Sequence, residues 1–227
     1  MTDHRGEAAE GSSVQAERAL WLVDIESPLL TESAMARIDD VDRPDRLAWN
    51  SFGTLALWDP DTWVPRFVEI ACGEGSPLQA LEWSGASVRP WAASLTLPGA
   101  SDVVIDGPEA LIVAVATLHT DPDVDELRAA ALEAVAHTLG PDKQVGFVIV
   151  APPGTPDLGP WLEVDAEEDR PDPDPTADLI PGASGWITWR DLSELALDLA
   201  EEADELRGEA VHRLVTEVQE LFPAADL

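Results

Sequence analysis

In the first third of the chain, apolar residues recur at the spacing of an amphipathic helix. Residues three or four positions apart lie on one helix face, and positions 47–58 show this spacing with Leu47, Trp49, Phe52, Leu55 and Leu57. A second helix is predicted over 61–72, where Asp59 or Asp61 can cap the first turn. Ahead of both, the short apolar run 19–25 (ALWLVDI) predicts an edge strand or a docking arm.

The period of the pattern changes in the middle of the chain. Short strands are predicted over 79–83, 91–97 and 101–106. The uninterrupted apolar run 110–117 (ALIVAVAT) is typical of a strand buried on both faces, and 144–150 (QVGFVIV) is a second one.

A helix is predicted between these two buried strands. It begins at Thr120 or Asp121 and ends at Gly140-Pro141, which stops helical geometry. A strand, a helix and a strand of these lengths form a crossover unit, and such units are almost always right-handed.

The last third of the chain alternates between a charged connection and helices. Residues 152–181 are rich in Pro, Asp and Glu and predict a stiff connection without a core of its own. The segment 185–191 then leads into a helix over 192–199. A final amphipathic helix carries apolar residues at three- and four-residue spacings, namely Leu206, Val211, Leu214, Val215, Val218, Leu221 and Phe222.

Together these elements predict an α/β fold. We expect a central mixed sheet of about four to five strands with flanking helices and a helical C-terminus. Residues 1–18 are polar and aperiodic and predict a disordered acidic tail. Residues 19–227 then form a single domain interrupted by the connection at 152–181.

Composition narrows the cellular setting. Hydrophobic residues make up 45% of the 227 residues, as in globular proteins. No apolar run reaches the roughly 18 residues of a membrane span, and the polar N-terminus lacks a secretory signal. The single cysteine, Cys72, cannot form an internal disulfide. These features predict a cytoplasmic protein without membrane contact.

Charge is the strongest compositional signal. Asp and Glu number 45 against 13 Lys and Arg, for a net charge of -32. Direct nucleic-acid binding is disfavoured, because affinity for phosphate comes from cationic side chains. Three interpretations stay open: a solvated surface suited to high salt, an acidic face that docks on a basic partner protein, or mimicry of DNA.

Several segments resemble cofactor-binding motifs but lack a residue or spacing that the motif requires. Residues 121–125 (DPDVD) begin like a calcium loop, but Glu126 and Leu132 stand where the loop needs Gly and a bidentate Glu. The four histidines show no metal-ligand spacing, and Gly73-Glu-Gly75 lacks the lysine of a phosphate loop. Cys72 ends an apolar helix and is interpreted as a buried structural thiol. No metal or other cofactor is predicted.

One constellation carries more information. Residues 102–117 (DVVIDGPEALIVAVAT) predict a hairpin whose first strand starts with an acidic residue and whose second strand is buried. This resembles the core of the PD-(D/E)XK nuclease superfamily, in which an Asp, a turn and an apolar strand ending in Glu-x-Lys follow one another. The helices before the hairpin, and the helix and buried strand after it, come in the order of that family.

The resemblance implies a site that has lost its chemistry. Asp102 matches the family's metal-binding Asp, and Glu69 matches an acidic residue of the preceding helix. At the Glu-x-Lys positions stand Val115, Ala116 and Thr117. Val115 cannot bind a metal and Thr117 cannot carry positive charge. These vestigial positions predict a non-catalytic relative of the nucleases.

Three functions remain in competition. The preferred one is a protein-binding or scaffolding subunit that uses its acidic surface on a basic partner. Tryptophans are numerous for a core of this size, and Trp21, Trp186 and Trp189 are candidate partner anchors. The alternatives are an active metal-dependent nuclease with relocated ligands, drawn from Glu69, Asp106, Glu109 or His119, and an acidic DNA-mimic inhibitor.

Overall fold

The computed structural model describes residues 44–90, 100–129, 143–162, 179–201 and 203–223. Several predicted features lie outside these residues: the tail 1–18, the run 19–25 with Trp21, the strand 91–97, the second half of the crossover helix, and residues 163–178 of the connection.

Two helices open the described chain, as the apolar spacing predicts. Helix α3 spans Pro44–Leu55 and helix α4 spans Pro60–Cys72. The side chain of Asp59 caps α4 by accepting a hydrogen bond from the backbone nitrogen of Asp61 at 3.1 Å. Phe52 from α3 packs edge-to-face on Trp63 of α4, with ring centroids 6.5 Å apart.

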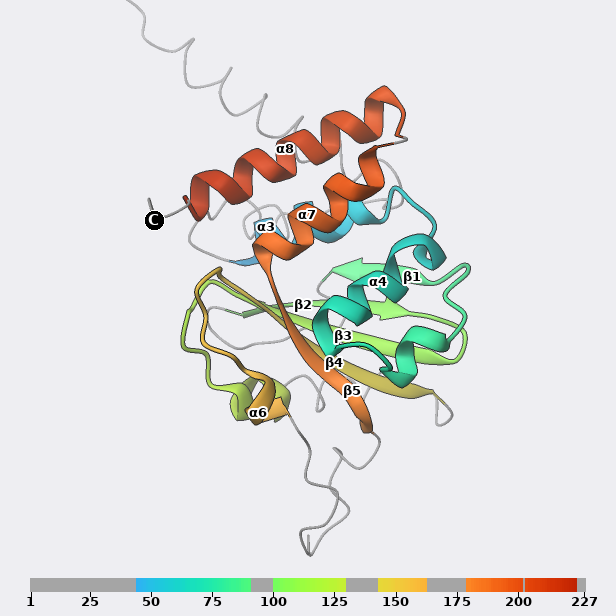
Figure 1. Cartoon of the computed structure of the whole chain (residues 1–227), viewed down its shortest axis with the longest axis vertical. Coiled ribbons are helices and arrows are strands. Elements are labelled where there is room, and N and C mark those ends of the chain that lie inside the picture. The colour runs from blue at the N-terminus through green and yellow to red at the C-terminus, as the bar shows by residue number, and fades with distance from the viewer. Residues whose placement is uncertain (1–43, 91–99, 130–142, 163–178, 202, 224–227) are drawn as a thin grey trace, which may run out of the picture.

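The centre of the protein is one mixed sheet, shown in Figure 1. Its strands are β1 (Ser87–Pro90), β2 (Ala100–Asp106), β3 (Ala110–Thr117), β4 (Gln144–Ala151) and β5 (Leu179–Thr188), and they lie side by side in chain order. The pairs β1–β2 and β2–β3 are antiparallel, whereas β3–β4 and β4–β5 are parallel. The prediction of a mixed α/β sheet is therefore confirmed.

Three local predictions are corrected. The strand expected at 79–83 is not formed: residues 79–80 end the 3₁₀ helix η1 (Pro77–Ala80), and residues 81–83 follow it as irregular backbone. Its backbone is held locally, because the nitrogen of Trp83 donates to Asp61 Oδ1 at 2.7 Å and the Trp83 indole donates to the Leu78 carbonyl at 3.1 Å. These bonds take the place of a strand ladder.

The second correction concerns β5. Its first residues fall in the Pro-rich stretch predicted to be a connection without a core, yet residues 179–188 form a strand because β4 supplies a parallel partner. The same stretch contributes Leu158 and Leu162 to the buried interior. The third concerns the crossover helix, whose described part begins at Val124. Asp123 caps it by accepting from the nitrogen of Glu126 at 3.0 Å, so the helix starts later than Thr120 or Asp121.

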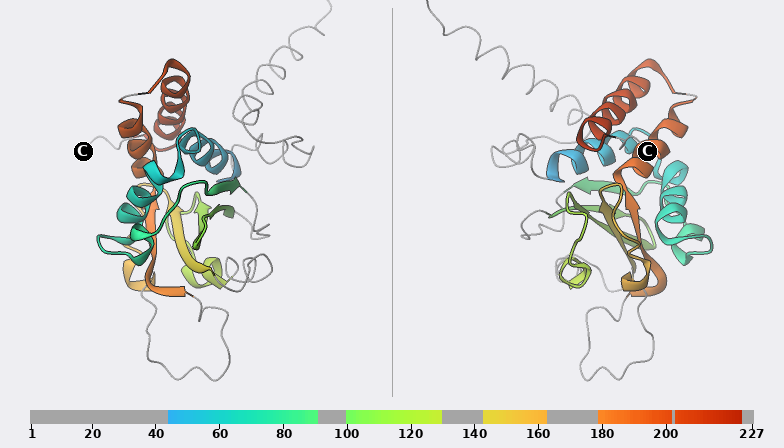
Figure 2. Two further views of the ribbon diagram at one scale, coloured as in Figure 1. Left: turned by 90° about the vertical axis from the view of Figure 1, so that its right-hand side faces the viewer. Right: turned by 60° about the vertical axis from the view of Figure 1, so that its left-hand side comes forward.

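Helices cover both faces of the sheet, as Figure 2 shows. On one face lie α3, α4, α7 (Trp189–Ala200) and α8 (Glu205–Leu221), which share a core with the residues of β3 at even positions. On the other face lie α6 (Gly159–Leu162) and the helix from Val124, which share a second core with the odd positions of β3. None of the described helices is long and apolar enough to cross a membrane.

Candidate functional site

Three of the vestigial positions meet at one end of the sheet, where β2 begins and β3 ends. Asp102 pairs with Val115 across the two strands, and Thr117 lies two pairs further along, opposite Ala100. Directly opposed side chains share a sheet face and have Cβ atoms about 5 Å apart. Asp102 and Val115 are both fully buried. The hairpin register therefore places a hydrocarbon side chain beside the buried carboxylate.

Val115 also belongs to the second core, with Leu111, Val113, Phe147 and Ile149. A carboxylate at this position would lie among aliphatic side chains, where burial of charge is strongly unfavourable. The end of β3 is therefore packed as part of the protein core.

Thr117 is engaged in holding the chain together. Its hydroxyl oxygen accepts a hydrogen bond from the backbone nitrogen of His119 at 3.0 Å, which shapes the turn after β3. Its carbonyl oxygen accepts one from the indole nitrogen of Trp189 at 3.0 Å. The second bond joins the end of β3 to the first residue of α7.

Trp189 is therefore a core residue, which corrects its assignment as a partner anchor. Its side chain is fully buried and packs in the first core. A side chain without exposed surface cannot contact a partner. Trp186, three residues earlier and on β5, is half-buried against the second core. Trp21 lies outside the described residues.

Glu69 does not join Asp102. It projects from α4, which covers the opposite face of the sheet, and it accepts a hydrogen bond from the side-chain nitrogen of Gln79 at 3.2 Å. Asp106 and Glu109 lie at the other end of the β2–β3 hairpin, since Asp106 pairs with Leu111. Of the suggested replacement ligands, only His119 lies at the end of the hairpin that carries Asp102, two residues after β3 ends.

Among the described residues, no group of three or more His, Cys, Asp or Glu side chains is arranged to hold a metal ion.

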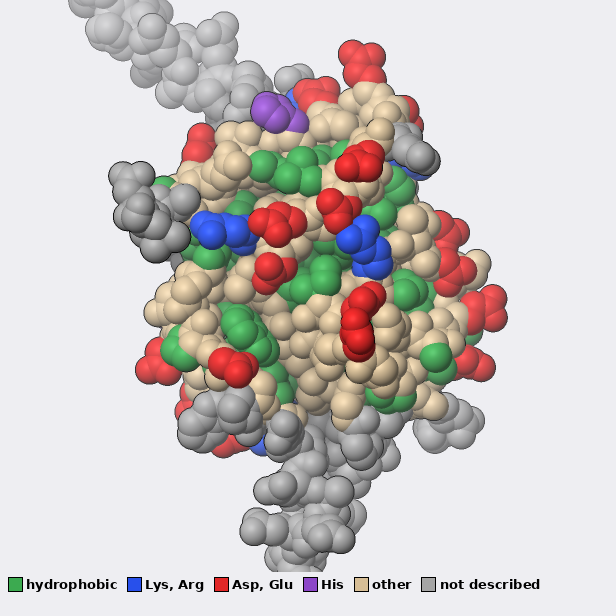
Figure 3. All heavy atoms as spheres, viewed as in Figure 1, with side chains coloured by type: hydrophobic (Ala, Val, Ile, Leu, Met, Phe, Trp, Pro, Cys, Tyr) green, Lys and Arg blue, Asp and Glu red, His purple; other side chains and the backbone are tan. Residues whose placement is uncertain are grey.

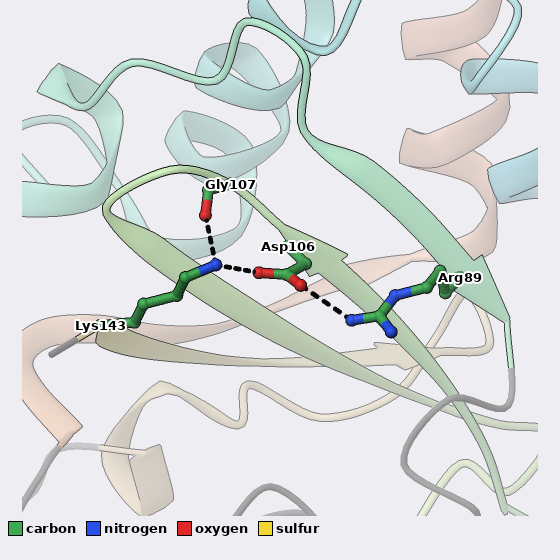
Figure 4. A network of polar contacts seen from close by, with 4 residues as sticks. All are labelled: Arg89, Asp106, Gly107 and Lys143. Carbon is green, nitrogen blue, oxygen red and sulfur yellow. Dashed lines mark hydrogen bonds and ion pairs between the residues drawn. The ribbon is translucent and has the colours of Figure 1, made fainter. Parts of the chain in front are cut away.

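The opposite end of the sheet carries a network of polar contacts, shown in Figure 4. Asp106 lies between Arg89, whose Nη2 is 2.8 Å from Oδ2, and Lys143, whose Nζ is 2.5 Å from Oδ1. Lys143 also donates to the carbonyl of Gly107 at 2.8 Å. These contacts tie β1, β2 and the residue before β4 together.

This network was not predicted from the sequence. The chain has one lysine, Lys143, directly before a buried strand, and Asp106 starts the tight turn of the hairpin. Those two features were the available signal. The side chains are 25–45% exposed, so each ion pair contributes only about 0.5–1 kcal/mol of stability. We interpret the network as a structural clamp on the sheet.

A polar groove of about 380 Å³ separates α3 from α8. Both oxygens of Glu217 on α8 are engaged there by α3, one by Arg46 Nε at 2.7 Å and one by the Asn50 amide at 2.6 Å. These contacts join the two helices, so the groove is explained by helix packing.

Cys72 ends α4 and is mostly buried. Burial raises the pKa of its thiol from 9.0 to about 12, and a hydrogen bond with Ser76 offsets part of the rise. A thiol of such high pKa is neutral at physiological pH and a poor nucleophile. The prediction of a structural thiol agrees with this environment.

Comparison of the chain with protein-family models, with curated proteins and with solved structures found no match.

Proposed function

We propose that this protein is a non-catalytic relative of the PD-(D/E)XK nucleases that acts as a protein-binding or scaffolding subunit through its acidic surface. The observation that carries the proposal is the pairing of Asp102 with Val115. At the position where the nucleases place their second carboxylate, this strand carries a buried aliphatic side chain.

The order and pairing of the elements support the relationship. The family's core has helical residues, an antiparallel hairpin, a crossover helix and a further strand. Here α3 and α4 precede the β2–β3 hairpin, and β4 pairs parallel with β3. The site would thus sit at the strand end that Asp102, Val115 and Thr117 share.

The chemistry of that strand end supports a non-catalytic role. Hydrolysis of a phosphodiester in this family relies on a divalent ion held by hard oxygen ligands, and the ion supplies several kcal/mol of charge stabilisation. Valine offers no ligand atom, and the Thr117 hydroxyl already accepts a backbone hydrogen bond. Asp102 would have to hold the ion without the second carboxylate of the family.

The surface supports the binding role. A net charge of -32 attracts basic partners and repels phosphate. Figure 3 shows acidic side chains spread over the helical face of the molecule with few cations between them. A partner with a basic surface fits this distribution.

Two measurements test the proposal. Purified protein is incubated with single- and double-stranded DNA and with RNA, each with Mg²⁺ or Mn²⁺, alongside Asp102→Ala. We expect no cleavage by either protein, and cleavage that is lost in Asp102→Ala refutes the proposal.

The second measurement is a titration of the protein with Mn²⁺ in which calorimetry records the heat of binding. We expect the heat to be the same for the wild type and Asp102→Ala, because any weak binding to surface acids is shared by both. A tight site that disappears in the variant would establish the relocated-ligand nuclease instead.

A further inference from the structure

The corner between α7 and α8 concentrates negative charge. Its exposed acidic side chains are Asp198, Glu201, Asp204, Glu205 and Glu209. We refer to these residues, together with Leu197 and Leu206, as the α7–α8 corner. Three of these acids pair with arginines of the chain: Asp198 with Arg66, Asp204 with Arg207 and Glu209 with Arg213. All three pairs are exposed to solvent, so they contribute little stability and leave the acids accessible. Arg207 also lies over the ring of Trp58, 5.5 Å from its centre.

The acidic side chains of α7 lie at positions where they destabilise the helix. Glu194, Asp198 and Glu201 follow one another at spacings of four and three residues, which brings like charges together on one helix face. The last turn of α7 has no basic residue, although the C-terminal end of a helix favours cations. The ion pair of Asp198 with Arg66 at 2.6 Å relieves only part of this repulsion.

Two large apolar side chains flank the same corner. Leu197 is 45% exposed and Leu206 is 48% exposed, the highest values among the large hydrophobic residues of the described chain. Because a short link joins α7 to α8, both leucines lie within about one helical turn of the corner. Figure 3 shows apolar and acidic side chains interspersed over these helices.

Exposed leucines beside acids that outnumber their arginine partners match one kind of partner. A basic amphipathic helix would cover the leucines with its apolar stripe, and its Lys or Arg residues would neutralise the acids that repel one another. A solvated acidic surface accounts for the charges alone, whereas a partner helix would use the charges and the two exposed leucines together.

We propose that the α7–α8 corner is the docking surface for a basic amphipathic helix of a partner protein. This inference rests on the proposed binding function and names the surface and the partner chemistry. Affinity comes from the leucines and the acids together, whereas the acids set the rate and the salt dependence of association.

The probe is a fluorescein-labelled peptide that repeats Leu-Lys-Lys-Leu-Leu-Lys-Leu, and its control has the same composition with the leucines spread around the helix. Binding to the full chain is followed by fluorescence anisotropy at about 0.15 M salt. We expect the amphipathic peptide to bind at least about tenfold more tightly than the control peptide. Equal affinity for the two peptides would show non-specific charge attraction and overturn the proposal.

Two pairs of variants locate the surface. Leu197→Ser/Leu206→Ser keeps the charge and should weaken the amphipathic peptide about fivefold or more. Glu201→Gln/Glu205→Gln should weaken it by a similar factor, whereas Glu74→Gln/Glu82→Gln removes the same charge elsewhere and should change it less than about twofold. Unchanged affinity in the leucine variant, or an equal loss in the two acid variants, overturns the proposal.

Hydrogen exchange distinguishes a failure of the α7–α8 corner as the docking surface from a failure of the proposed binding function. We expect the bound peptide to protect backbone amides of α7 and α8. Protection confined to other elements would refute the α7–α8 corner and leave the binding function in place. Cleavage that depends on Asp102 would refute the binding function whatever the peptide does.

Discussion

The close packing of α4 on β5 at Gly185 predicts the effect of adding a single methyl group. Gly185 lies on β5, opposite Val148 of β4, and it is buried under the C-terminal turn of α4. A Cβ atom built at Gly185 would stand 2.1 Å from the carbonyl oxygen of Ala71 and 2.8 Å from the Cα of Cys72. Gly185→Ala should therefore force α4 away from the sheet.

The size of the effect follows from what the methyl group meets. Real Cβ atoms essentially never approach another atom within 3.0 Å, and the atoms here are backbone, which cannot rotate aside. Overpacking of a well-packed core costs about 1–3 kcal/mol, and we expect the upper end, about 3 kcal/mol, because a whole helix has to shift. For a protein of this size, such a loss lowers Tm by roughly 6–12 °C.

The assay is denaturant unfolding followed by tryptophan fluorescence, for which the chain offers nine tryptophans. Gly208→Ala is the matched control, since it adds the same methyl group inside α8 with no atom within 4 Å. Removing a glycine from a helix interior should stabilise the protein by about 1 kcal/mol. The two variants are thus expected to change stability in opposite directions.

If Gly185→Ala unfolds within about 0.5 kcal/mol of the wild type, the close packing of α4 on β5 is wrong. If Gly208→Ala destabilises the protein as strongly as Gly185→Ala, the effect comes from alanine itself and not from the contact with Ala71.

Four further predictions concern single side chains. Trp189→Phe removes the hydrogen bond to the Thr117 carbonyl and leaves a buried acceptor unsatisfied, so the free energy of unfolding should fall by about 1–3 kcal/mol in denaturant titration. An unchanged free energy of unfolding would show that this hydrogen bond does not hold the end of β3 to α7. Thr188→Ala breaks the capping box of α7 and should lower the same quantity by about 1 kcal/mol, with Thr188→Ser largely restoring it. Asp106→Asn removes two partly exposed ion pairs and should cost about 1 kcal/mol in low salt, with the difference from wild type shrinking in high salt; a loss that does not depend on salt would contradict an electrostatic clamp. Burial raises the pKa of Cys72 to about 12, so the thiol contributes stability in full below pH 9 that is lost between pH 9 and 12, and Cys72→Ala should flatten the fall of unfolding free energy over that window.

The sequence determined those elements whose signal is local. The run 110–117 contains no polar residue before its end, and it forms β3 over those same residues because both sheet faces are covered. Asp59 and the apolar spacing after it define α4 without help from other parts of the chain. The pairing of Asp102 with Val115 also follows from local information, since the hairpin turn sets the register of the two strands.

Tertiary structure decided the features that need a distant partner. Residues 179–188 contain Pro181 and Gly182, which disfavour a strand, and only parallel pairing with β4 makes them one. The burial of Trp189 depends on the end of β3, which lies 72 residues earlier in the chain. The separation of Glu69 from Asp102 depends on which sheet face α4 covers. Local periodicity shows which side of a helix or strand faces the core. The element that packs against that side is decided by the fold of the whole chain.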